Sequence, residues 1–86
     1  RKDRMILVDL EAASMGRTYN FQLDEQVKIA TLMEEITEMI CQKEHCSLTG
    51  DPERMCLCCK ETQVILDREA TLKEYGITNG MNLILL

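Results

Sequence analysis

The closing stretch of the chain, TLKEYGITNGMNLILL, constrains the fold more than any other part of the sequence. Thr71 is a favourable N-cap and Gly76 a favourable left-handed C-cap, so a helix between them lasts about one turn. Asn79 and Gly80 then form a dipeptide that accepts positive φ. The apolar, uncharged run 81–86 is too short for a buried helix and is typical of a central strand. We therefore expect the chain to finish inside its own core sheet.

Length and composition limit the classes of protein that this chain can represent. With 86 residues it forms one domain with a modest core, and its 45% hydrophobic and 29% charged residues are typical of a globular protein. The net charge of −5, without a cluster of Lys or Arg, repels a phosphate backbone, so we expect no nucleic-acid binding. No apolar stretch is long enough to cross a bilayer and no export signal is visible, which predicts a cytoplasmic protein without direct membrane insertion.

Two strands and one long helix are predicted from the first half of the chain. Residues 5–13 are predicted as a strand in which Ile6, Val8 and Leu10 face the core and alternate with Leu7, Asp9 and Glu11. Residues 19–24 alternate between apolar and polar side chains, so the two segments are predicted to form an antiparallel hairpin. Asp24 is placed to cap a helix, with Glu25 in its first turn. From Val27 to about Glu44 the apolar residues recur at three- and four-residue spacing, which predicts a helix with one buried face.

The second half of the chain is predicted to complete a β-grasp fold. Residues 54–60 are predicted as a third strand and residues 64–66 as a fourth, before the short helical turn and the last strand. The expected fold class is α+β, a mixed sheet of about five strands with one main helix packed on one face. We expect a single domain over residues 5–86, and residues 1–4 to be a disordered or appended N-terminal segment.

The order of elements resembles ubiquitin over nearly the whole chain. A closer resemblance is to the YukD-like family, which includes EsaB and comprises small ubiquitin-like proteins of the WXG100 (type VII) secretion systems of Gram-positive bacteria. The run from Tyr75 to Gly80 before a final strand carries this resemblance, as does the short connection from Asp24 to Val27. The resemblance to ubiquitin also includes Leu66, Asp67, Thr71, Leu72, Tyr75, Gly76 and Ile77.

The resemblance implies an accessory or regulatory protein that works by binding, without conjugation, catalysis or a cofactor. Its expected partners are protein subunits of the secretion machinery, and its expected location is the cytoplasm, with recruitment to the inner face of the membrane by the secretion complex. Related domains are fused to a membrane subunit of mycobacterial systems, so the domain is also compatible with a larger subunit. No triad, paired-carboxylate or phosphate-loop arrangement indicates an enzyme.

Two alternatives from other functional classes remain. Sulfur carriers and protein modifiers of this fold act through a tail that ends in a glycine pair, whereas the sequence here ends in Ile84, Leu85 and Leu86, which favours the absence of conjugation. The other alternative is a metal-binding adaptor, in which Cys41, His45 and Cys46 meet Cys56 or Cys58.

The cysteines themselves favour packing over metal binding. An odd number without an export signal indicates reduced thiols, with redox sensing as a further alternative. The run 56–59 lies in a predicted strand, where alternate side chains point to opposite faces, so its three thiols cannot converge on one ion. We therefore expect no metal. The five cysteines are Cys41, Cys46, Cys56, Cys58 and Cys59.

The outer face of the sheet, away from the helix, is the predicted protein-binding surface. If the first and last strands are parallel neighbours whose alternate residues face the helix, the intervening apolar residues face outward. An exposed apolar cluster on such a face usually marks a contact, either with a secretion subunit or with a second copy as a homodimer. A mildly apolar surface without a partner is the alternative. The predicted binding residues are Leu7, Cys58, Lys60, Ile84 and Leu86.

Overall fold

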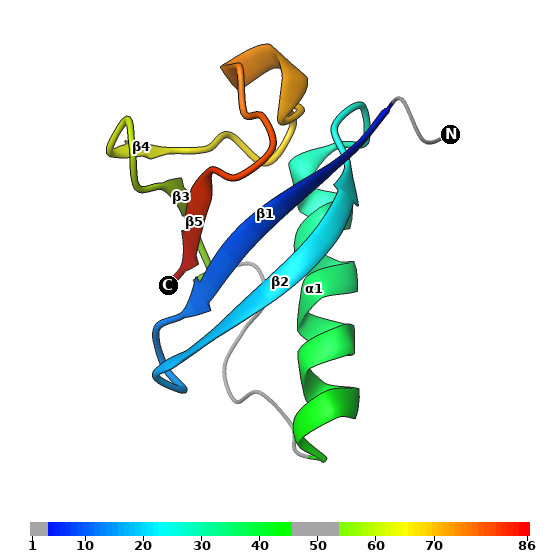
Figure 1. The fold of residues 1–86 in the computed structure, drawn as a ribbon, viewed down its shortest axis with the longest axis vertical. Coiled ribbons are helices and arrows are strands. Elements are labelled where there is room, and N and C mark those ends of the chain that lie inside the picture. The colour runs from blue at the N-terminus through cyan, green and yellow to red at the C-terminus, as the bar shows by residue number, and fades with distance from the viewer. Residues whose placement is uncertain (1–3, 46–53) are drawn as a thin grey trace.

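The computed structural model describes residues 4–45 and 54–86, and it confirms the predicted order of elements. One mixed sheet of strand order β2-β1-β5-β3-β4 is covered on one face by the helix α1, as Figure 1 shows. Strands β1 and β5 are parallel at its centre, and the other pairs are antiparallel. The expected ubiquitin-like β-grasp class is confirmed. The elements are β1 (Met5–Ala12), β2 (Arg17–Asp24), α1 (Ile29–Glu44), β3 (Leu57–Cys59), β4 (Val64–Ile65), the 3₁₀ helix η3 (Lys73–Tyr75) and β5 (Asn82–Leu85).

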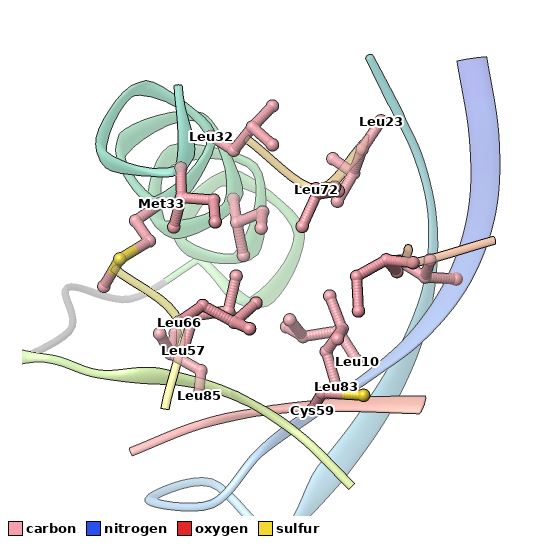
Figure 2. Close-up of a cluster of buried hydrophobic side chains, with 14 of the residues drawn as sticks. Leu10, Leu23, Leu32, Met33, Leu57, Cys59, Leu66, Leu72, Leu83 and Leu85 are labelled. Carbon is pink, nitrogen blue, oxygen red and sulfur yellow. The ribbon is translucent and has the colours of Figure 1, made fainter. Parts of the chain in front are cut away.

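The core lies between the inner face of the sheet and the apolar face of α1. Figure 2 shows Leu10 and Leu83 from the two central strands on the sheet side of this core, with Leu32 and Met33 of α1 above them. These side chains are almost completely buried because strand alternation and helical spacing both direct them inward. Because alternate side chains of each strand point into this core, the residues between them must lie on the outer face of the sheet.

The helix begins later than the sequence predicts, and Asp24 does not cap it. One Asp24 oxygen accepts the backbone N–H of Gln26 at 2.9 Å, and the other pairs with Arg4 at 2.8 Å. Arg4 also contacts this segment through its backbone carbonyl, which accepts the N–H of Glu25 at 2.8 Å.

Backbone carbonyls from a distant segment take the place of a side-chain cap on α1. The N–H groups of Ile29 and Ala30 donate to the carbonyls of Ala70 and Arg68, at 2.8 and 2.9 Å. These bonds satisfy two of the donors that a helix start leaves unpaired. The first turn contains no acidic residue, so the expected role of Glu25 there is wrong as well.

The short helix near the end of the chain is confirmed with its predicted signals. The hydroxyl of Thr71 accepts the N–H of Glu74 at 3.2 Å, and the carboxylate of Glu74 accepts the N–H of Thr71 at 2.8 Å. This reciprocal pair is a capping box. Gly76 ends the turn with φ of 70°, and Gly80 has φ of 86° at the predicted turn before β5.

Candidate protein-binding face

A row of apolar and thiol side chains crosses the outer face of the sheet on β5, β3 and β4. Ile84 lies opposite Cys58, and Cys58 lies opposite Ile65 on its other side. The neighbours of Ile84 along β5, Leu83 and Leu85, are buried against the helix, so Ile84 must point outward. Ile65 is 65% exposed, more than any other large hydrophobic side chain in the described part of the chain.

A second pair extends this row toward one end of the sheet. Cys56 and Leu86 exchange two backbone hydrogen bonds, of 3.0 and 2.9 Å, which continue the β3·β5 ladder. Leu86 is 58% exposed. Each of the two residues lies two positions from an outward residue of its own strand, so both share the outer face. We call the resulting surface the apolar patch: Cys56, Cys58, Ile65, Ile84 and Leu86.

Leu7, which the sequence predicted as part of the same surface, lies apart from the apolar patch. It faces outward and is 47% exposed, as expected. However, the parallel register places Glu11 of β1, not Leu7, beside Ile84. Lys60 reaches across β5 to form a 2.6 Å ion pair with Glu11. Of the five predicted residues, Cys58, Ile84 and Leu86 therefore come together, Lys60 borders them, and Leu7 is separated by this polar pair.

The thiols of β3 and of Cys56 just before it alternate between the two faces of the sheet, as the sequence predicted. Cys59 is completely buried in the core, whereas Cys56 and Cys58 are partly exposed on the outer face. Burial, and to a lesser degree the neighbouring Cys56, raises the pKa of the Cys58 thiol above its ordinary value. Cys58 is therefore a protonated, weakly polar member of the apolar patch at neutral pH.

The structure brings no metal-ligand cluster together among the residues that it describes. Within residues 4–45 and 54–86 no three His, Cys, Asp or Glu side chains are placed to hold one ion. His45 is the C-cap of α1 with φ of 55°, and its N–H bonds to the carbonyl of Cys41. Cys46, the remaining member of the metal-site alternative, lies outside the described residues.

A carboxylate fixes the start of β5 beside the apolar patch. Glu61, in the turn after β3, accepts the backbone N–H of Asn82 at 3.0 and 3.1 Å and its side-chain amide at 2.8 Å. The backbone N–H of Lys60 in turn donates to the carbonyl of Asn82 at 2.9 Å. The Asn82 hydrogen bonds hold the pKa of Glu61 below its usual range. This clamp aligns β5 with β3 and so places Ile84 next to Cys58.

Two members of the apolar patch were missed by sequence reasoning. Ile65 was assigned to the fourth strand but not to the site, and Cys56 was interpreted as a packing thiol or a metal ligand and not as part of the binding surface. A signal for Ile65 was present, because Leu66 reads as core and its neighbour in a strand must then face outward. Finding Cys56 requires the β3·β5 register, which the sequence does not supply.

Comparison with protein families identifies the group to which this domain belongs. Residues 6–85 match the family model described as "WXG100 protein secretion system (Wss), protein YukD". The chain belongs to the YukD family. No curated protein matches it significantly. The family assignment agrees with the resemblance seen in the sequence.

Solved structures confirm that this YukD-family chain has the ubiquitin-like fold. A ubiquitin-like domain of an Arabidopsis thaliana protein is 21% identical with a TM-score of 0.71, over 96% of this chain and 77% of that one. Caldiarchaeum subterraneum ubiquitin is 13% identical with a TM-score of 0.67, over 94% and 90%. A chain of the MycP5-free ESX-5 inner membrane complex is 16% identical with a TM-score of 0.77, over 96% of this chain but only 21% of that chain.

None of the helices in the described ranges, 4–45 and 54–86, has the length and apolar character needed to cross a membrane.

Proposed function

We propose that this YukD-family protein is a non-catalytic accessory of a WXG100 secretion system and that it binds protein subunits of that system through the apolar patch. The observation that carries the proposal is the gathering of Ile65, Ile84 and Leu86 on the face of the sheet that α1 does not cover. Two of these side chains are more than half exposed, and apolar surface of this kind gains free energy when a partner covers it.

The structural neighbours give this proposal a context. The ESX-5 inner membrane complex contains a chain of which a segment with the same fold occupies about a fifth. A domain of this shape is therefore compatible with the surroundings of a secretion membrane complex. We accordingly place the protein in the cytoplasm, recruited to the inner face of the membrane by the subunit that it binds.

The chemistry of the patch supports binding and offers nothing for catalysis. Its members are aliphatic side chains and thiols, and Cys58 is held protonated by burial. Two of the charged residues that border it, Glu11 and Lys60, neutralise each other. The same surface also allows copies of the protein to associate with one another as an oligomer.

Substitutions on β4 and β5 test the proposal. Ile65 faces outward and the adjacent Val64, 39% exposed, faces the other side of the same strand. We expect Ile65→Ser combined with Ile84→Ser to reduce co-purification of identified WXG100 subunits about tenfold, the usual effect of losing 1–2 kcal/mol of buried apolar contact. Val64→Ser is the control and retains binding. Equal recovery of those subunits by the double variant and the control would refute the proposal.

Sedimentation of the purified protein separates the two uses of the patch. If the double variant abolishes a dimer but leaves recovery of secretion subunits unchanged, the patch serves self-association and the proposed partner is wrong. Loss of recovery in a protein that is monomeric throughout supports binding to a secretion subunit.

A further inference from the structure

The outer edge of β2 carries six backbone groups that β1 does not use. On β1, the N–H of Asp9 bonds to the carbonyl of Met81, and the carbonyl of Leu7 accepts the N–H of Gly80, so odd-numbered residues of β1 bond toward β5. Even-numbered residues of β1 therefore bond toward β2, and the register pairs them with odd-numbered residues there. The N–H and carbonyl groups of even-numbered β2 residues point away from β1. Apart from Asp24 at the end of the strand, whose carbonyl accepts the N–H of Val27 at 3.3 Å, these residues are Thr18, Asn20 and Gln22.

No described residue supplies a backbone partner for these groups. Within residues 4–45 and 54–86, none of the six takes part in a backbone hydrogen bond outside the β1·β2 ladder. We call this row of donors and acceptors the β2 edge. Figure 1 shows β2 at the border of the sheet, with β1 on one side only.

Between its charged end residues, Arg17 and Asp24, the β2 edge lacks the features that normally protect an edge strand. β2 is eight residues long and pairs with β1 in an uninterrupted register, without a bulge. Neither proline nor lysine occurs in its sequence RTYNFQLD. Natural edge strands are usually short or carry such residues, as at the opposite edge, where β4 has only two residues. A long, unprotected edge is suited to accept a further strand.

An apolar side chain of α1 lies beside this edge. The Lys43 ammonium lies 5.8 Å from the centre of the Tyr19 ring, which places the Lys43 flank of the helix next to β2. Met39 is one turn earlier on the same flank and is 38% exposed. Phe21, stacked on Tyr19 and partly buried, faces the same side of the sheet. A strand added to β2 would therefore place alternate side chains over Met39 and Phe21.

The charges at one end of the β2 edge indicate where the added strand carries an acidic residue. Arg17 is 64% exposed and Lys43 is exposed, and the only described carboxylate that pairs with Arg17 is Glu44, at 3.7 Å. Two cations against one carboxylate leave a local positive charge on a protein whose net charge is −5. An acidic residue at that end of the partner complements this charge.

We propose that the β2 edge binds an extended acidic peptide segment as a sixth strand, with alternate apolar side chains facing Met39 and Phe21. This site lies on the border of the sheet and is separate from the apolar patch on β3, β4 and β5. It gives the protein a second contact, for a partner segment that is itself unstructured or at a chain end. The backbone bonds provide affinity, and the apolar and acidic positions provide selection.

Titration with a defined peptide tests the proposal. The probe is the blocked synthetic peptide Asp-Asp-Val-Thr-Val-Thr-Val, compared with a peptide in which both aspartates are lysine. We expect the acidic peptide to bind at least about tenfold more tightly, to shift the amide resonances of Thr18, Asn20 and Gln22, and to slow the hydrogen exchange of these three amides. Absence of binding at millimolar concentration, or resonance shifts confined to β3 and β5, would overturn it.

Two variants separate the β2 edge from other surfaces. Asn20→Pro removes one outward N–H without removing a bond to β1, and Asn20→Ala, which loses the same side chain but keeps the N–H, is its matched control. We expect about tenfold weaker binding to the proline variant than to the alanine variant. Equal affinity would contradict the proposal.

Charge reversal provides a test that does not depend on how well the proline variant folds. Lys43→Glu, at an exposed helix position, should weaken binding of the acidic peptide and strengthen binding of the lysine peptide. Unchanged preference would contradict the proposal. So would protection of the three edge amides in peptide-free protein that sediments as a dimer, since a second copy would then occupy the edge.

Discussion

Glu11 and Lys60 form an ion pair across the outer face of β5, although their strands β1 and β3 do not pair with each other. The ion pair crosses the sheet between two separate apolar surfaces, Leu7 on one side and the patch around Ile84 on the other. Because both side chains are partly exposed, solvent screens the attraction. The ion pair therefore contributes little to the stability of the fold, and its main effect is to place polar side chains between the two apolar surfaces.

Replacing Lys60 tests how little this ion pair contributes to stability. We expect Lys60→Ala to lower the free energy of unfolding by less than about 1 kcal/mol, with the difference shrinking in high salt. Urea denaturation with and without added sodium chloride measures both effects. Lys73→Ala is the control, because Lys73 makes no described ion pair within residues 4–45 and 54–86. A loss above about 2 kcal/mol would show that the pair supports the sheet.

The side chain of Asn79 supplies a hydrogen bond that a strand partner would otherwise make. Its Oδ1 accepts the backbone N–H of Leu7 at 2.7 Å, next to the bond from the Gly80 N–H to the Leu7 carbonyl. We expect Asn79→Ala to cost about 1 kcal/mol and to speed hydrogen exchange at the Leu7 amide. Asn79→Asp keeps an acceptor oxygen and should preserve the protection. Equal exchange in the two variants would contradict this role.

The clamp between Glu61 and Asn82 predicts a dependence of stability on pH. The folded pKa of Glu61 lies below the unfolded value, so its contribution is present above the unfolded pKa and is lost as the pH falls through the folded one. Glu61→Gln should therefore lower the thermal midpoint at pH 7, and the difference should shrink as the pH falls below the ordinary carboxylate value of 4.5. Thermal unfolding from pH 7 down to pH values below the ordinary carboxylate pKa measures this difference, with Glu34→Gln at an exposed position as the control. A difference independent of pH would exclude the proposed clamp.

The two thiols of β3, Cys58 and Cys59, should differ in their reaction with an alkylating reagent. Cys59 is completely buried and should react at least about a hundredfold more slowly than it does in urea, since the protein must open first. Cys58 reacts without unfolding but more slowly than in urea, because its raised pKa lowers the thiolate fraction. Iodoacetamide labelling followed by peptide mass spectrometry gives both rates. Labelling of Cys59 at its unfolded rate would mean that β3 does not hold this side chain in the core.

Strand identity and orientation were predictable because they depend on local alternation. The burial of Ile6, Val8 and Leu10 on β1 follows from the sequence pattern alone, and the short helix η3 was predictable from Thr71 before it and Gly76 after it. The start of α1 was not predictable in this way. Asp24 is a good cap by type, but the donors of the first turn are satisfied by carbonyls from residues 68–70, and tertiary partners of this kind leave no local signal.

The candidate site was predictable in orientation but not in register. Alternation was sufficient to place Leu7, Cys58, Ile84 and Leu86 on the outer face. Whether Leu7 touches Ile84 depends on the offset between β1 and β5, which starts with Asp9 beside Asn82. The sequence separation between these strands is too large for the offset to follow from turn chemistry, so the polar pair between the two surfaces was missed.

The central position of β5 has a consequence for how the domain is made. Its parallel partner β1 is the first strand of the described chain, and β5 is the last, so the middle of the sheet joins residues more than 70 positions apart. During synthesis the β1·β2 hairpin and α1 leave the ribosome well before the strand that covers the other side of β1. Loop closure over this distance is slow, so we expect folding to begin only when residues 82–85 are free to insert. The domain is thus assembled after translation of its final strand rather than element by element.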